Sequence, residues 1–183
     1  SFEPCRWGDI MNNASSKTVA IFIDVTDENW RQLAVNIADV AQQQDVQPHV
    51  VVLDRTTSGL GNVAGVSVIR VGPDASYGDA IQIGLKKTPS ELIALSIPGV
   101  RSLPKRLIRQ RAELAIKTST DLVTSNLVLM DAAGNLVAEA NPQKADEAPT
   151  PFWQAGTMVR RRALARMGRS ADLPVDLFLY MKL

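Results

Sequence analysis

The sequence predicts an α/β fold, an open and mostly parallel sheet with helices on both faces, which ends in a β-hairpin and short helices. Apolar runs of strand length occur near residues 19–23, 50–53 and 91–97, and segments of helical periodicity separate them. The first strand, the helix after it and the second strand fit within about 35 residues, the size of a βαβ unit. These strands should therefore be parallel.

The chain has 183 residues, which is enough for one well-buried core, and we expect a single domain over residues 18–183. Lys and Arg number 20 against 19 for Asp and Glu, so no net field attracts nucleic acid or an anionic membrane. Cys5 is the only cysteine and His49 the only histidine, which excludes an internal disulfide and a zinc site built on these residue types. This composition favours a cytoplasmic location, and no apolar run reaches the roughly 18–20 residues that span a bilayer.

The two ends of the chain differ from the predicted domain. Residues 1–17 are expected to be an N-terminal arm or a leader, because a polar start typical of a chain comes only at Met11. Phe2 and Trp7 are large apolar groups, so we expect this arm to pack on another surface. Residues 175–183 are apolar at helical spacing and stop abruptly, which predicts a truncated chain or one that ends inside its own core.

The first strand is expected at 19–23, because three of these five apolar residues are β-branched and such a run suits a strand buried on both faces. Thr26 and Asp27 can cap the helix that follows. The inward face of that helix is expected to carry Trp30, Leu33, Ile37 and Val40. The second strand, 50–53, ends at Asp54.

The next segment, Gly59 to Ala64, formally matches a G-x-G-x-x-A dinucleotide fingerprint. That fingerprint binds a cofactor only where a strand turns directly into a helix. Here the residues predict another strand at 66–71, so a dinucleotide site is the third alternative for the function.

A second helix is expected at 74–87, because Pro89 stops it and two lysines suit its C-terminal end. The central strand at 91–97 and a third helix from Pro104 follow. The inward residues of the two helices are expected to be Ala80, Ile81, Gly84 and Leu85, then Leu107, Ile108, Ala112 and Ile116. The basic residues Lys105, Arg106, Arg109 and Arg111 are expected to face outward.

A β-hairpin is expected at 127–137, with its turn at 131–135. Residues 141–151 contain three prolines and predict a surface loop. Strand character returns at 152–159, and a short basic helix from Arg160 should end at Gly168.

Several residues of these elements follow one another in a characteristic order along the chain. Glu28 lies in the first turn of the helix after the first strand, Asp54 closes the second strand, and the second helix carries Gly78, Ala80 and Gly84. Residues 161–168 read Arg-Arg-Ala-Leu-Ala-Arg-Met-Gly. In this order the chain, over residues 18–183, resembles the family 2 glycosyltransferases of the A-type fold. Members of this family transfer a sugar from a nucleotide diphosphate donor, and the resemblance implies a nucleotide-diphospho-sugar transferase-like fold.

The resemblance implies nucleotide binding by Glu28 and Asp54, phosphate binding by Arg161 and Arg162, and a general base at Asp176. Each residue also has an ordinary structural explanation. A carboxylate can cap a turn or interact favourably with a helix dipole, and a basic pair can be exposed charge. Both explanations stay open for each residue.

The metal-binding Asp-x-Asp of the family aligns with Ile97-Pro98-Gly99, where both acids are absent. Carboxylate oxygens hold the divalent ion that stabilises a departing nucleotide diphosphate. We therefore expect no cofactor and no divalent metal, and a remaining transfer reaction would need a cationic substitute such as Arg101 or Arg55.

Because both acids of the Asp-x-Asp motif are absent, two functions stay open. The first is a glycosyltransferase-like domain that has lost metal-dependent sugar transfer and serves in protein interaction or assembly, with another protein or a peptide as its partner. The alternative is an active, metal-independent family 2-type glycosyltransferase that uses a nucleotide diphosphate sugar. The sequence leaves open whether the chain is an enzyme.

Overall fold

The computed structural model describes residues 18–131, 133, 135–140 and 155–167. The expectations that lie outside these residues are the N-terminal arm at 1–17, the surface loop at 141–151, the helix end at Gly168 and the apolar segment at 175–183.

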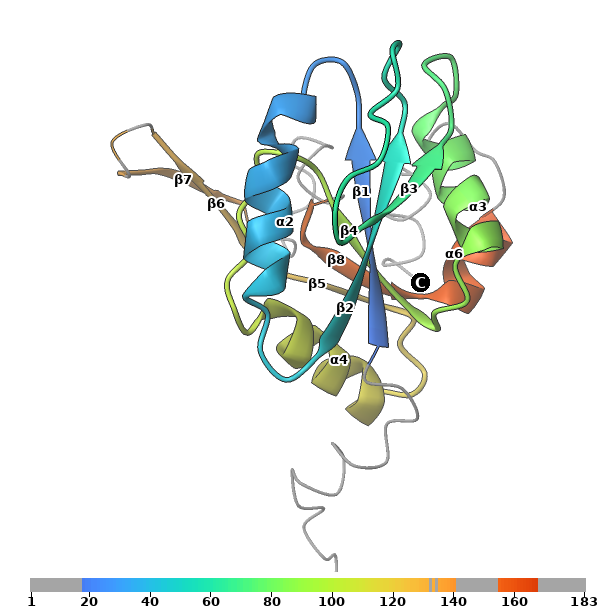
Figure 1. The fold of residues 1–183 in the computed structure, drawn as a ribbon. Coiled ribbons are helices and arrows are strands. Elements are labelled where there is room, and N and C mark those ends of the chain that lie inside the picture. Colours follow the sequence, from blue (N-terminus) through green and yellow to red (C-terminus); the bar gives the residue numbers. More distant parts are fainter. Residues whose placement is uncertain (1–17, 132, 134, 141–154, 168–183) are drawn as a thin grey trace, which may run out of the picture.

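Six strands form one sheet in the order β3-β2-β1-β4-β8-β5 (Figure 1). Four of them are parallel, namely β1 (Thr18–Val25), β2 (Gln47–Asp54), β3 (Ser67–Arg70) and β4 (Leu92–Ser96). The other two run beyond β4: β8 (Thr157–Arg160) is antiparallel to β4, and β5 (Leu122–Thr124) is antiparallel to β8. The predicted open, mostly parallel sheet is confirmed, and the 91–97 run is a central strand.

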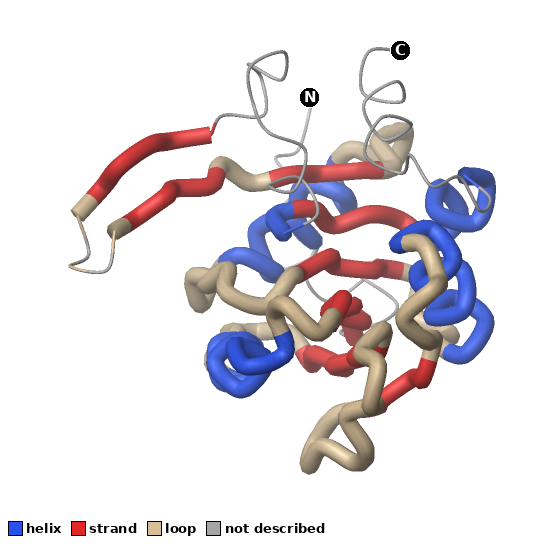
Figure 2. The backbone as a smooth tube through the Cα atoms, turned by 90° about the horizontal axis from the view of Figure 1, so that it is seen from above, coloured by secondary structure: helices blue, strands red, loops and turns tan. Residues whose placement is uncertain are grey.

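Helices cover both faces of this sheet, as the sequence predicts (Figure 2). The described helices are η1 (Trp30–Gln32), α2 (Leu33–Ala41), α3 (Tyr77–Lys87), α4 (Arg106–Ile116) and α6 (Arg161–Met167). Core residues of α2 and α4 pack on one face, and those of α3 and α6 pack on the other. The core therefore forms two layers with the sheet between them.

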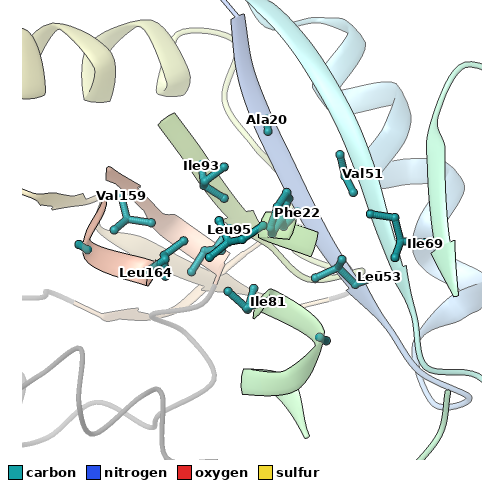
Figure 3. Packing of buried hydrophobic residues seen from close by; sticks show 13 residues of the cluster. Ala20, Phe22, Val51, Leu53, Ile69, Ile81, Ile93, Leu95, Val159 and Leu164 are labelled. Atoms are coloured by element: carbon teal, nitrogen blue, oxygen red, sulfur yellow. The ribbon is translucent and has the colours of Figure 1, made fainter. Parts of the chain in front are cut away.

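Strand β1 is buried on both faces because its alternate side chains point into different layers. Phe22 lies in the layer under α3 and α6, together with Leu53, Ile81 and Leu95 (Figure 3). Ile21 lies in the layer under α2 and α4. A strand buried on both faces requires apolar residues at consecutive positions, which explains the continuous run in the sequence.

Helix α3 lies close to the sheet because Gly84 has no side chain. A Cβ at this position would come 2.7 Å from Phe22 Cε2 and 2.9 Å from Leu53 Cδ2. The helix begins at Tyr77, three residues later than expected, because Ser76 accepts a hydrogen bond from the Asp79 N–H and forms a capping box with that residue.

Some expected inward and outward faces are wrong. Trp30 was expected in the core, but it is 46% exposed, because it lies in the 3₁₀ turn η1, before the first residue of α2, and the period of that helix does not extend to it. Arg111 was expected to face outward, but it is buried. Arg106 also points inward, because its Nη1 donates to the carbonyl oxygen of Ala155 at 2.5 Å.

The predicted hairpin is present as β6 (Leu127–Met130) and β7 (Leu136–Ala140), which form a separate two-stranded sheet. It projects away from the body of the protein (Figures 1 and 2). In the described part of the chain, its strands pair only with each other.

Candidate functional site

Three strands bring polar residues to one edge of the sheet. We call this edge, with the loops 26–29, 55–60 and 97–105, the carboxyl edge. Asp24 lies near the end of β1, Asp54 ends β2 and Ser96 ends β4. Strand order reverses direction here, since β2 lies on one side of β1 and β4 on the other. Open α/β sheets bind ligands at such a switch point, so this edge is the candidate site.

Asp54 is buried and is bound by its own loop. Its Oδ1 accepts hydrogen bonds from the Thr56 N–H at 3.0 Å and from the Thr56 hydroxyl at 2.7 Å. Its Oδ2 accepts from the Leu60 N–H at 3.0 Å, and Arg70 Nη1 lies 3.1 Å from Oδ1. Burial raises the pKa of the Asp54 carboxyl, but the hydrogen bonds from Leu60 and Thr56 and the charge of Arg70 outweigh it and hold the pKa below its ordinary value. Both carboxylate oxygens are thus already bonded within the chain.

Asp24 and Arg55 form a two-bonded ion pair between the ends of β1 and β2. Arg55 Nε donates to Asp24 Oδ1 at 2.8 Å, and Nη2 donates to Oδ2 at 2.7 Å. Arg55 Nη1 also donates to the carbonyl oxygen of Ala75 at 2.8 Å, which joins the pair to the approach of α3. The hydrogen bonds with Asp24 raise the pKa of the Arg55 guanidinium. Arg55 therefore fixes one side of the carboxyl edge.

Asp27 joins the first two loops of this edge. Its carboxylate accepts from the Thr57 N–H at 3.0 Å and from the Thr57 hydroxyl at 2.5 Å. These hydrogen bonds lower the pKa of the Asp27 carboxyl. Glu28, the neighbouring acid, is exposed, and within the described residues it takes part in no ion pair. Of the acids in these two loops, Glu28 is the one that faces solvent without such a bond.

The loop after β4 is held by Asn36 of helix α2. Asn36 Nδ2 donates to the Val100 carbonyl oxygen at 2.9 Å and to the Ile97 carbonyl oxygen at 3.1 Å. It also lies 3.3 Å from the Ser96 hydroxyl, and its Oδ1 accepts from the Gly99 N–H at 2.9 Å. One buried amide therefore bonds to the whole turn that ends the central strand.

Helix α2 continues to bind this loop toward α4. Asp39 Oδ2 accepts from Arg101 Nε at 2.7 Å and from the Ser102 N–H at 3.3 Å. Gln43, beyond the helix end, donates to the Leu103 carbonyl oxygen at 2.9 Å and accepts from the Leu107 N–H at 3.1 Å. We call Asn36, Asp39 and Gln43 the polar ladder. Asn36 and Asp39 lie on one face of the helix, and Gln43 follows two residues after its end.

The residues at the end of β4 do not fit a divalent metal ion. Ile97 and Gly99 offer no side-chain oxygen, and the carbonyl oxygens of Ile97 and Val100 accept from Asn36. Hard cations such as Mn²⁺ or Mg²⁺ prefer carboxylate oxygens. Across the described ranges, no three His, Cys, Asp or Glu side chains form a group that could hold a metal ion.

The expected phosphate-binding pair lies at the opposite edge of the sheet. Because β8 is antiparallel to β4, its last residues lie beside Leu92, at the start of the central strand. Arg161 donates to the carbonyl oxygens of Leu85 and Thr88 at the end of α3. It thereby bonds to the end of a helix whose last carbonyls have no partner within the helix.

Arg162 lies at the same edge as Arg161, opposite the carboxyl edge. Its side chain forms an ion pair of 2.6 Å with Asp121 and donates to the Thr118 carbonyl oxygen at 3.3 Å. The fold therefore brings Glu28 and Asp54 to one edge and keeps Arg161 and Arg162 at the other. Asp176, the expected base, lies outside the described residues.

Sequence reasoning missed Asp24 and the polar ladder. An acid near the end of an apolar, fully buried strand was a signal, because such a residue needs a partner. The arginine directly after the neighbouring strand, Arg55, was that partner. The ladder residues gave a weaker signal, since Asn36 and Asp39 fall on the inward face of a helix with an otherwise apolar pattern.

The fold is that of the A-type nucleotide-sugar glycosyltransferases. A mannosyltransferase from Pyrobaculum calidifontis, solved in complex with GDP-Man and Mn²⁺, matches 84% of this chain with a TM-score of 0.55 and 13% identity. A glucosyl-3-phosphoglycerate synthase from Mycobacterium tuberculosis, solved with Mn²⁺, UDP-Glc and phosphoglyceric acid, matches 88% with a TM-score of 0.51 and 14% identity. A mycobacterial protein matches 87% with a TM-score of 0.55 and 14% identity.

The chain spans 48% of the mannosyltransferase, 64% of the synthase and 58% of the mycobacterial protein. No protein-family model and no curated protein matches it. Among its described helices, none combines the length and apolar character needed to cross a bilayer.

Proposed function

We propose that this chain is a glycosyltransferase-like domain that has lost metal-dependent sugar transfer and serves in protein interaction or assembly. One observation carries the proposal: most polar groups at the carboxyl edge are bonded to the chain itself. Asp54 is bound by Thr56, Leu60 and Arg70, and Asp24 is bound by Arg55. A nucleotide would have to share these acids with the partners that already hold them.

The residues at the position of the family's metal-binding acids support the same proposal. The similar mannosyltransferase and synthase were solved with Mn²⁺ and a nucleotide sugar. In this chain Ile97 and Gly99 stand where the family has its two acids, and Asn36 holds the turn that contains them. Without those carboxylates the chain offers nothing at this position to hold the ion that would balance the charge of a departing diphosphate.

A second candidate, a metal-independent transferase, is favoured by Glu28. This acid is exposed at the carboxyl edge, where it could accept hydrogen bonds from a base or ribose. In this candidate Asp54 would act by holding the loop 55–60 in place beside the nucleotide. The two candidates differ in whether the chain binds a nucleotide sugar at all.

The test is calorimetric titration of GDP-mannose and UDP-glucose into the protein, with and without Mn²⁺. The proposal expects no binding heat in any titration. Binding that Mn²⁺ strengthens would overturn it and return the chain to the metal-dependent enzymes. Binding with the same affinity in the presence and absence of Mn²⁺ would favour the second candidate. In that case Glu28→Gln should weaken the binding. The matched control Glu91→Gln, at an exposed acid next to the start of β4, should leave the binding unchanged.

A further inference from the structure

Helix α4 carries buried polar side-chain atoms that have no hydrogen-bond partner. Within the described residues these atoms are Arg106 Nε, Gln110 Oε1 and Arg111 Nη1. A buried polar group without a partner costs free energy, and native structures usually satisfy it with a protein group, a water molecule or an ion. Arg111 lies five residues after Arg106, which turns it to a different side of the helix. Arg106 and Gln110 therefore form one place at which a bound molecule could complete the hydrogen bonds.

Arg106 and Gln110 lie about one helical turn apart and bond to consecutive residues at the start of β8. Arg106 Nη1 donates to the Ala155 carbonyl oxygen at 2.5 Å, and Gln110 Nε2 donates to the Gly156 carbonyl oxygen at 2.6 Å. Gln110 Nε2 also donates to the Ser125 hydroxyl oxygen at 2.9 Å. A carbonyl oxygen can only accept, so the atom of the Gln110 amide that lacks a partner is its oxygen. We call Arg106 Nε and Gln110 Oε1 the unpaired atoms.

The Arg106 guanidinium is a cation without an acidic partner among the described residues. It takes part in none of the ion pairs that these residues form. Burial lowers the pKa of this guanidinium to about 10, so it still carries its charge at neutral pH. Helix α4 begins at Arg106 and has no acid in its first turn, so the positive end of its dipole adds to this charge. An anion beside Arg106 would offset the cost of burying the cation.

The two unpaired atoms need different groups from a ligand. Arg106 Nε carries a hydrogen and needs an acceptor, which binds more strongly if it is negatively charged. Gln110 Oε1 carries no hydrogen and needs a donor. At neutral pH chloride, acetate and sulfate can only accept, and a water molecule leaves the charge of Arg106 unbalanced. A phosphate ion that keeps one proton, or a hydroxy acid, offers both an anionic oxygen and an O–H group.

We propose that Arg106 and Gln110 bind an oxyanion that also carries a hydroxyl group. An anionic oxygen of this ligand accepts from Arg106 Nε, and its hydroxyl donates to Gln110 Oε1. Gln110 is 3% exposed, whereas Arg106 is partly exposed, so the site lies just beneath the protein surface. The inference goes beyond the proposed function, because it uses none of the acids of the carboxyl edge and requires no nucleotide.

Thermal unfolding in matched salts tests this proposal. Phosphate is compared with sulfate, and glycolate with acetate, at pH 7 and equal ionic strength, because only the first ion of each pair carries a hydroxyl. A ligand that binds the folded chain raises its unfolding midpoint, so we expect a higher midpoint with the hydroxyl-bearing ion. A difference in the phosphate pair alone assigns a phosphate ligand, and a difference in the glycolate pair alone assigns a hydroxy acid. Equal midpoints within both pairs would overturn the proposal.

The substitution Arg106→Gln separates binding at this site from the general effect of each salt on stability. It should weaken binding of the hydroxyl-bearing ion at least about tenfold and remove the difference between the paired salts. Arg109→Gln is the matched control, because Arg109 is an exposed arginine of the same helix, and it should keep the difference. A difference that survives Arg106→Gln would place the ion elsewhere and overturn the proposal.

Equilibrium dialysis of the unchanged protein covers the case in which Arg106→Gln does not fold. We expect saturable binding of one phosphate or one glycolate per chain. An equal concentration of sulfate should leave the phosphate in place, and acetate should leave the glycolate in place. Absence of saturable binding, or equal competition by the ion without a hydroxyl, would overturn the proposal. Because no nucleotide sugar is used, either result leaves the test of the proposed function unchanged.

Discussion

The N–H of Gly99 donates a 2.9 Å hydrogen bond to the side-chain oxygen of Asn36, 63 residues earlier in the chain. Asn36→Ala removes this acceptor and the donor to Val100 together. Buried backbone groups then lose their partners, and we expect the free energy of unfolding to fall by about 1–3 kcal/mol. Urea unfolding measures this change.

The control for this prediction is Asn62→Ala, because Asn62 is exposed in the loop after β2. It should change the free energy of unfolding by less than about 0.5 kcal/mol. Equal effects of the two substitutions would show that Asn36 does not hold the loop after β4.

Gly84→Ala is expected to destabilise the protein although alanine favours helices. The added Cβ would come 2.7 Å from Phe22 and 2.9 Å from Leu53, and overpacking of this kind costs about 1–3 kcal/mol. Thermal unfolding should show a lower midpoint. Lys86→Ala, at an exposed position of the same helix, should leave the midpoint nearly unchanged, and a stabilised Gly84→Ala protein would contradict the packing of α3.

Asp24 and Arg55 should be strongly coupled in a double-mutant cycle. Both side chains are largely buried, with exposed fractions of 8% and 17%. Arg55→Met leaves the Asp24 carboxylate without its charged partner and should cost about 3–5 kcal/mol. The double variant Asp24→Asn, Arg55→Met should lose less than the sum of the two single losses. Additive losses would mean that the pair contributes nothing as a pair.

The Asp54 carboxyl should make the free energy of unfolding depend on pH. Its pKa in the folded protein lies below the ordinary value of 3.8, so its contribution is complete above that pH and disappears as the pH falls through the lower folded value. Asp54→Asn should therefore be less stable than the unchanged protein at pH 7, and this difference should shrink below about pH 4. Asp74→Asn, at an exposed position, is the control. If the difference in the free energy of unfolding between the two proteins stayed constant down to pH 2, the hydrogen bonds described for Asp54 would be contradicted.

Patterns within short segments predicted much of the fold. The apolar run at 19–23 indicated a buried strand, and the spacing of Ala80, Ile81, Gly84 and Leu85 indicated one face of a helix, because both patterns depend on local geometry alone. The exposure of Trp30 could not be predicted in this way. Trp30 lies in the 3₁₀ turn η1, and the apolar spacing alone does not show that the α-helix begins only at Leu33.

The candidate site was predictable only in part. Asp54 was expected at a strand end and Glu28 in the first turn of a helix. The structure places both at the carboxyl edge, with Glu28 in the loop 26–29. Their proposed nucleotide contacts stay predictions, and so does the base at Asp176. Arg161 and Arg162 are consecutive in a motif, but the direction of β8 decides which edge they reach, and that direction is a property of the whole sheet.

Gly99 has a φ of +93°, and a Cβ added to it would come 3.1 Å from Gln32 Oε1. An aspartate at this position would be strained, and Asn36 already bonds the backbone carbonyl oxygen of residue 97. A metal site built from aspartates at 97 and 99 would therefore also need changes at Gln32 of η1 and Asn36 of α2. An engineered metal site at this turn would therefore call for several simultaneous substitutions, because each one made alone is expected to lower stability before any ion could bind.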